Sequence, residues 1–452
     1  MSIALRSIAA PAIEVPLQQP AIPGATYAAR CNEAYRRAGH DWLVIYADRE
    51  HNANIIFMSG FDPRFEEALL LLGPGEQRIF VVGNEDESYT AISPLPGKQV
   101  MLAQSMSLLA QDRSRRPSVE AVLRECGIKS GDSVGVVGWK YFEGTEWDGE
   151  EPGLFVPAYL PILLKRITGQ SPAEATPVLM HETEGLRSVV DADQIAAYEW
   201  GAARASAAVW RMVTGIQAGD SELLAASRMG YAGEPMNCHP MLTTSDATGP
   251  VIGLSSPTGR IIGKGNGISA AVSFWGGLAS RAGLVTDHDE AFLATAKSYF
   301  EGLITWYETA DLGVTGGEIH DAVTGALARG GLGSALNPGH LTGHDEWLNS
   351  PVRPGSQSRI ASGMPFQIDV IPVPMPNGWA LNCEDAVTFA DAALREELRT
   401  RHPQVYARIE QRRAFMRDEL GVAIHDAILP MSSTPLCLPP FWLASNMLLA
   451  RA

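Results

Sequence analysis

The stretch that decides the fold runs from residue 337 to residue 385 and reads NPGHLTGHDEWLNSPVRPGSQSRIASGMPFQIDVIPVPMPNGWALNCED. It contains a Gly-His pair at 339–340 and a Gly-Met pair at 363–364. An acid, Asp369, follows six residues after the second glycine, and Glu384–Asp385 closes the stretch. Imidazole and carboxyl groups are the side chains that most often transfer protons in enzyme sites. We therefore expect a functional site in the last third of the chain.

The bulk composition is that of a globular protein with two or three domains. A chain of 452 residues is too long for one compact core. Its 51 acidic and 35 basic residues give a formal charge of -16, which argues against a nucleic-acid partner because no basic stripe could neutralise phosphates. The five cysteines are odd in number and form no CxxC pair, so they indicate neither a disulfide framework nor a zinc clip.

Neither end of the sequence predicts a membrane partner. The N-terminal residues lack a charged segment followed by an uninterrupted apolar core, so we expect no signal peptide. The uncharged run 427–450 is long enough to span a bilayer, but its four prolines would break a membrane helix. We expect this run to be buried and extended, and we expect a cytoplasmic protein.

Alternating helices and strands in the first part of the chain predict an α/β domain. The expected strands span 42–47, 55–58, 68–72, 79–82 and 133–137, and the expected helices span 27–38 and 118–126. Residues 1 to about 25 are rich in proline and are expected to form an arm. Near Leu186 the pattern changes, and Asp191 or Asp193 can cap a new amphipathic helix. We place the domain boundary near residue 180, which gives domains 1–180 and 181–452.

The motifs between 337 and 385 resemble the C-terminal half of the pita-bread superfamily, which includes methionine aminopeptidase, Xaa-Pro peptidases, creatinase and ectoine hydrolase. The segment NIIFMSGFDPRFEEALLLL at 54–72 resembles the N-terminal domain of creatinase and Xaa-Pro peptidases. The resemblance implies a creatinase-like α/β domain followed by an α+β pita-bread domain with pseudo-twofold duplication. It also implies a homodimer with its pocket near the subunit boundary.

A similarity between two stretches of the sequence agrees with such a duplication. Residues 216–222 parallel residues 312–318, and each stretch follows one long helix and opens another. In the second copy Thr315 and Glu318 are predicted to form a capping box, in which each side chain accepts a hydrogen bond from a free backbone amide. Asp220 or Ser221 is expected to cap the helix in the first copy.

The resemblance also implies where metal ligands would lie. Metal-dependent members take a His and two acids from this half, and those positions are His340, Asp369 and Glu384 here. Two further Asp ligands would lie six residues after the Gly265 turn and three residues before Arg281. Those positions are Ala271 and Leu278, which cannot ligate a cation, so a two-metal cluster lacks its bridging carboxylates. We expect no cofactor and no metal, as in creatinase and ectoine hydrolase. One cation on the remaining three ligands is the open alternative.

Proton transfer is then assigned to histidines. We expect His340 and His239 to act as acid and base, with His344 as a further candidate, because imidazole titrates near neutral pH. Asp369 and Glu384 would orient an imidazole or fix the substrate. The position of the proton-shuttling His of creatinase is Ser255 here, and the position of a creatinase Glu is Ser280. Creatine is therefore not the expected substrate.

The expected substrate contacts come from both domains. Arg281 can bind a carboxylate in bidentate fashion, and Arg64 is available for the same purpose. Phe61 and Arg64 lie where creatinase-like proteins reach from one subunit into the pocket of the partner. Trp275 would form an apolar pocket floor. Ser255, in the loop 253–260, is a further expected substrate contact. No GxSxG elbow surrounds it, which argues against a role as nucleophile.

These observations predict a metal-independent hydrolase that acts on a non-peptide C–N bond, of amide, lactam or guanidino type, in a small polar molecule. Two alternatives stay open. One is a Xaa-Pro peptidase-like metallohydrolase with a reduced one-metal site. The other is a catalytically inert pita-bread domain that binds a partner.

Overall fold

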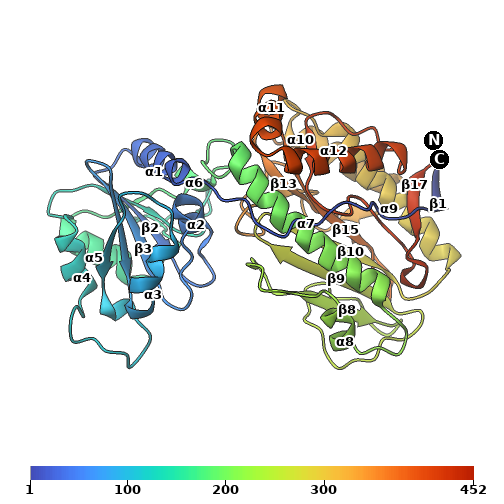
Figure 1. Cartoon of the computed structure of the whole chain (residues 1–452), viewed down its shortest axis with the longest axis horizontal. Coiled ribbons are helices and arrows are strands. Elements are labelled where there is room, and N and C mark those ends of the chain that lie inside the picture. The colour runs from blue at the N-terminus through green and yellow to red at the C-terminus, as the bar shows by residue number, and fades with distance from the viewer. Residues whose placement is uncertain (1) are drawn as a thin grey trace. The chain divides into compact units, whose positions relative to one another are not determined.

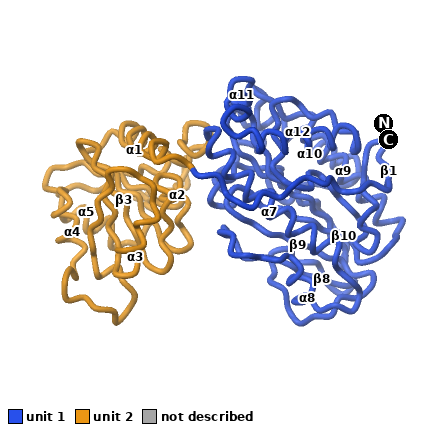
Figure 2. Tube along the Cα trace, viewed as in Figure 1, with its two compact units in different colours: residues 1–21, 189–452 blue, residues 22–188 orange. Residues whose placement is uncertain are grey.

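The computed structural model describes residues 2–452, which divide into two compact units. Unit 2 is the continuous segment Ile22–Ser188 (Figure 2). Unit 1 combines the residues before Ile22 with Val189–Ala452. Each unit has its own sheet and its own helices (Figure 1).

Unit 2 is built on a six-stranded mixed sheet with the spatial order β5-β4-β3-β2-β6-β7. The pairings among β2, β3 and β4 are antiparallel, and the other three are parallel. The strands are β2 (Trp42–Ala47), β3 (Ala68–Gly73), β4 (Gln77–Val82), β5 (Gln99–Leu102), β6 (Val134–Val137) and β7 (Ala173–Glu174). The helices are α1 (Gly24–Ala38), α2 (Ala53–Ser59), α3 (Asn84–Tyr89), α4 (Val119–Glu125), α5 (Tyr159–Thr168) and α6 (Pro177–Met180).

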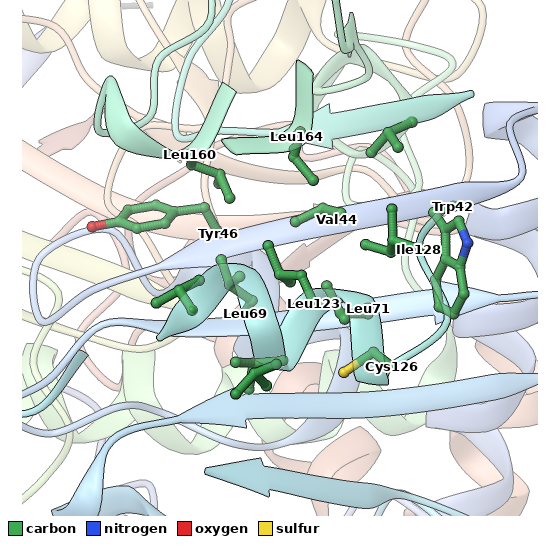
Figure 3. Close-up of a cluster of buried hydrophobic side chains, with 14 of the residues drawn as sticks. Trp42, Val44, Tyr46, Leu69, Leu71, Leu123, Cys126, Ile128, Leu160 and Leu164 are labelled. Carbon is green, nitrogen blue, oxygen red and sulfur yellow. The ribbon is translucent and has the colours of Figure 1, made fainter. Parts of the chain in front are cut away.

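The core of unit 2 explains its apolar strands. Val44 and Tyr46 of β2 and Leu71 of β3 belong to one cluster with Leu123 of α4 and Leu160 of α5 (Figure 3). Helices α1 and α2 pack against β2 as well. Strands covered on both faces read as continuous apolar runs rather than as alternating ones. The α/β organisation expected from the sequence is confirmed in this unit.

One expected strand is a helix. Residues 55–58 lie inside α2, and all seven residues of that helix are buried. A short apolar run that is buried on every side carries no periodicity, so it cannot distinguish a strand from a helix. The helix ends at Gly60, which adopts a left-handed conformation with φ +68° and donates its N–H to the Ile56 carbonyl at 2.7 Å.

Unit 1 contains the larger, antiparallel sheet, with the path β12-β13-β15-β10-β9-β8 and with β16 paired to β15. Its strands are β8 (Met241–Ser245), β9 (Gly267–Phe274), β10 (Gly277–Leu284), β12 (His340–Leu341), β13 (Pro365–Ile368), β15 (Asn382–Phe389) and β16 (Ile428–Pro430). A small sheet joins β11 (Gly333–Ser334) to β14 (Pro372–Val373). The helices are α7 (Ala192–Gly215), α8 (Glu222–Ser227), α9 (Glu290–Thr309), α10 (Gly316–Arg329), α11 (Ala392–Arg401) and α12 (Pro403–Asp418).

Helix caps in unit 1 follow the sequence signals. Asp191 caps α7, which packs across β9 and β10. The predicted capping box of Thr315 and Glu318 is present at α10. Ser221 caps α8 in the first copy by accepting from the Leu224 amide at 3.1 Å.

The two terminal segments of unit 1 are held in place. Strand β1 (Ile3–Ser7) pairs with β17 (Met447–Arg451). The expected N-terminal arm is therefore partly a strand, and Leu17 further along accepts a hydrogen bond from the Trp200 indole. The run 427–450 is largely buried and contains β16, as expected. Within residues 2–452, no helix is both long and apolar enough to cross a membrane.

Candidate active site

A cavity of about 590 Å³ lies on one face of the large sheet of unit 1. Strand pairing places Met241, Ala271, Ser280 and Glu384 in one row across β8, β9, β10 and β15. Residues directly opposite on neighbouring strands share a face, so the whole row faces the cavity. Four consecutive strands therefore supply one wall of the site.

Hydrocarbon occupies the two positions where metal-dependent members of this fold would carry Asp. Ala271 and Leu278 are 6% and 5% exposed and pack with Met241, with Cys238 beside them. Among residues 2–452, no group of three or more His, Cys, Asp or Glu side chains is arranged to hold a metal ion. These two positions therefore supply no carboxylate to a two-metal cluster, because their side chains are hydrocarbon.

His340 lies directly beneath the cavity wall and is fully buried. Its Nδ1 is 3.1 Å from the Leu341 carbonyl and must donate there, which leaves Nε2 as the second titrating nitrogen. Nε2 lies 3.2 Å from Oε1 of Glu346 and 4.0 Å from Oδ2 of Asp369. The ring stacks on Trp347 with centroids 4.0 Å apart. His340 therefore acts on the cavity through Glu346 and Asp369, which line it.

The electrostatics of His340 combine two opposing effects. Burial alone lowers the pKa of an imidazole because it penalises the charged form. The negative charges of Glu346 and Asp369 and the hydrogen bonds of the ring outweigh burial, so the pKa of His340 is raised. A protonated His340 is thus favoured beside Glu346.

Two carboxyl groups at the cavity have raised pKa values. Burial raises the pKa of Asp369 to about 6, against the opposing effect of His340. Burial also raises the pKa of Glu384 well above its usual range, and the charges of Asp369 and Glu346 add to the effect. Glu384 accepts from Nδ2 of Asn382 at 2.5 Å, and Asn382 also donates to Ser280 at 3.2 Å. The protonation of Glu384 therefore depends on the charges of its two acidic neighbours.

Glu346 is the cavity residue that the sequence analysis missed. It follows His344 and Asp345 in one loop, and the sequence alone does not tell which of these side chains points inward. The structure turns Glu346 and Trp347 to the cavity and buries His344 on another side. The Tyr198 hydroxyl lies 3.4 Å from Nδ1 of His344.

Two predicted residues lie together outside the cavity lining. Trp275 in the β9–β10 turn contacts the ring of His344 edge-on at 5.3 Å between centroids. Neither side chain is among those that line the cavity within residues 2–452. Trp275 is therefore not the floor of this cavity, because its ring packs against that of His344.

His239 lines the cavity, whereas Ser255 is not among the described lining residues. His239 is exposed, lines the cavity and has its Nε2 3.3 Å from the Leu254 carbonyl. Ser255 fixes its loop through the backbone, since it donates to the Ile252 carbonyl and accepts from the Leu242 amide. The cavity lining includes Gly253 and Leu254 but not Ser255.

Arg281 does not serve as a carboxylate receptor in this structure. Its guanidinium is 1% exposed and forms a fork to Asp385 at 2.9 and 3.0 Å. Nη2, which makes both of these contacts, also donates to the Thr434 carbonyl, while Nη1 donates to the Ser280 and Glu384 carbonyls and Nε to the Cys437 carbonyl. All five donors are used inside the protein, so none is left for a substrate.

Two predicted contact residues belong to unit 2. Phe61 is fully buried among Phe80 and Tyr89, so its ring belongs to the core of that unit and cannot reach a pocket elsewhere. Arg64 is exposed and donates to the Tyr89 hydroxyl at 2.7 Å. Its predicted contact with a partner subunit stays a prediction.

No protein-family model and no curated protein matches the sequence, whereas solved structures match it in fold. Dipeptidase PepE from Mycobacterium ulcerans has a TM-score of 0.60 at 18% identity, with 82% of this chain and 94% of that chain covered. A prolidase from Thermococcus sibiricus has a TM-score of 0.65 at 16% identity, with 82% and 95% covered. A Xaa-Pro dipeptidase from Bacillus anthracis has a TM-score of 0.61 at 13% identity, with 82% and 96% covered.

The likeness extends over nearly the whole length of these peptidases and concerns the fold. It includes a mixed α/β sheet followed by an antiparallel sheet flanked by helices. The chain therefore has the two-domain pita-bread architecture seen in these prolidase-like structures.

Proposed function

We propose that this protein hydrolyses a non-peptide C–N bond of amide, lactam or guanidino type in a small molecule, without a metal ion. The supporting observation is the convergence of Glu346, Asp369 and Glu384 above His340, beside a patch where hydrocarbon replaces metal ligands. Proton transfer by side chains is the chemistry that such a set can perform.

The roles follow from two carboxyl groups in different surroundings, which can serve as base and acid in one reaction. Glu346 faces the cavity, has 27% of its side chain exposed and pairs with His340, so it is the proposed base. Burial raises the pKa of Glu384 and so favours its protonated form, which makes it the proposed acid. His340 is a positioning residue that lies 3.2 Å from Glu346 and orients its carboxyl group.

The bond changes balance with water as the only co-reactant. Glu346 takes a proton from water while the water oxygen forms a bond to the carbonyl carbon. Glu384 gives its proton to the leaving nitrogen as the C–N bond breaks, which releases an amine and an acid. The proton on Glu346 returns to solvent through the exposed His239, and Glu384 takes up a proton again.

The test is a turnover screen of amides, lactams and guanidino compounds with chelator-treated protein. Glu346→Gln and Glu384→Gln should each lower kcat about 100-fold or more, which is the usual contribution of a positioned acid or base. His340→Gln should shift the pH dependence of kcat, because it removes the charge that faces Glu346. Glu150→Gln, which alters an exposed acid of unit 2, is the matched control and should leave kcat unchanged.

Two results would contradict the proposal. Unchanged turnover in Glu346→Gln and Glu384→Gln would remove the assigned acid and base. Activity that is lost on chelation and restored by a divalent cation would support the one-metal alternative instead.

A further inference from the structure

The cavity is walled mainly by hydrocarbon from two loops. Val251, Ile252 and Leu254 come from the loop after β8, and Ile371, Val373 and Met375 come from the segment around β14. Ile252 and Leu254 are 61% and 77% exposed, so large apolar side chains at this cavity face water. A ligand with an apolar body would release that water on binding.

Acidic side chains outnumber basic ones in the lining of the cavity. Glu346, Asp369 and Glu384 line it, and no Lys or Arg does so within the described residues 2–452. The buried Arg281 lies on the same sheet, but its five donors are already used. A ligand carboxylate would therefore meet the carboxyl groups of Glu346 and Asp369 with no Lys or Arg in the described lining to offset them, which is an arrangement that selects against it.

The polar end of the cavity suits an uncharged amide. Oδ1 of Asp369 is buried, accepts no hydrogen bond within residues 2–452 and can receive one from a substrate N–H. A carboxamide or lactam also offers a carbonyl oxygen, which can accept from a protonated carboxyl group. A cavity of about 590 Å³ holds a molecule considerably larger than a simple amide.

We propose that the substrate of this site is an uncharged carboxamide or lactam with a sizeable apolar body, and that molecules bearing a free carboxylate are excluded. This inference rests on the proposed function. It replaces the small polar substrate expected from the sequence with an uncharged molecule that has an apolar body.

The test compares two matched probes, 4-phenylbutanamide and 4-phenylbutanoate, by isothermal titration calorimetry at neutral pH. The amide should bind at least about tenfold more tightly than the carboxylate, since only the carboxylate is repelled by the acidic lining. Equal or tighter binding of the carboxylate would overturn the proposal, and so would failure of the amide to bind.

A charge variant gives a second, independent measurement. Leu336 lines the cavity and is 46% exposed, so Leu336→Lys adds a cation there with little effect on packing. It should narrow the preference for the amide severalfold by strengthening binding of the carboxylate. Leu109→Lys, at a 90% exposed leucine of unit 2, is the matched control and should leave the preference for the amide unchanged. An identical preference in Leu336→Lys and wild-type protein would contradict the charge argument; Leu254→Lys repeats the test if Leu336→Lys fails to fold.

Binding and turnover separate the two proposals. An amide that binds selectively and is not cleaved would contradict the proposed hydrolysis and leave the ligand class in place. Cleavage of small polar substrates that carry a carboxylate would support hydrolysis and overturn the ligand class.

Discussion

Ala271 and Leu278 lie on the cavity face of β9 and β10, where a metal cluster would need carboxylates. Burial penalises the ionised form of a carboxyl group. It raises the pKa values of Asp369 and Glu384, which line the same cavity.

The raised pKa of Asp369 predicts how the stability of the protein depends on pH. Asp369 titrates near pH 4 in an unfolded chain, and burial raises its pKa to about 6 in the folded protein. Between these pH values the folded state binds more protons, so the contribution of Asp369 to stability falls as pH rises. Asp369→Asn, which does not titrate, should gain about 2 kcal/mol of unfolding free energy relative to wild type between pH 4 and pH 7.

Urea unfolding of wild-type protein and of Asp369→Asn at several pH values checks this prediction. Asp321→Asn, at an exposed acid beside His320, is the control and should show little change in the difference. A difference between wild type and Asp369→Asn that stays constant from pH 4 to pH 7 would show that the carboxyl group keeps its ordinary pKa.

At the scale of secondary structure, Arg281 joins three segments. Its side chain extends from β10 and pairs with Asp385 of β15. It also donates to the carbonyls of Thr434 and Cys437 in the C-terminal segment. A fully buried guanidinium persists only when its charge and donors are satisfied. The ion pair therefore fixes β15, and with it Glu384, against the neighbouring strand.

Arg281→Ala should lower the unfolding free energy by roughly 3 to 5 kcal/mol, because it leaves Asp385 as an unpaired buried charge. Arg399→Ala is the matched control: its pair with Glu396 is exposed and should contribute less than about 1 kcal/mol. Denaturant titration measures both. An Arg281→Ala protein of wild-type stability whose only defect is weaker substrate binding would return Arg281 to the role of a substrate ligand.

At the scale of the whole molecule, the resemblance to creatinase implies a homodimer, and Arg64 is the exposed residue expected to reach the partner. The prediction is a mass of twice 48.6 kDa in sedimentation equilibrium at micromolar concentration. If Arg64 contacts the site of the partner, Arg64→Ala should raise KM without changing stability, because its side chain is exposed. A monomeric species with full activity would exclude this arrangement.

Much of the fold could be predicted from local signals. The runs 42–47 and 68–72 are apolar throughout because helices cover both faces of their sheet. Asp191 and the Thr315–Glu318 pair mark helix starts through hydrogen bonds between residues close in sequence. The prediction of a strand at 55–58 was wrong because complete burial removes the periodicity that distinguishes a helix from a strand.

For the candidate site too, some features could be predicted from the sequence and others only from the tertiary structure. The resemblance to pita-bread motifs pointed to His340, Asp369 and Glu384 and to hydrocarbon at 271 and 278, because related chains keep the spacing of such motifs. Spacing did not show that His340 is covered by Trp347, that Glu346 turns inward or that Arg281 is saturated. Those facts depend on side-chain directions and on partners more than 100 residues away in sequence, such as Asp385 for Arg281, and only packing in three dimensions brings such groups together.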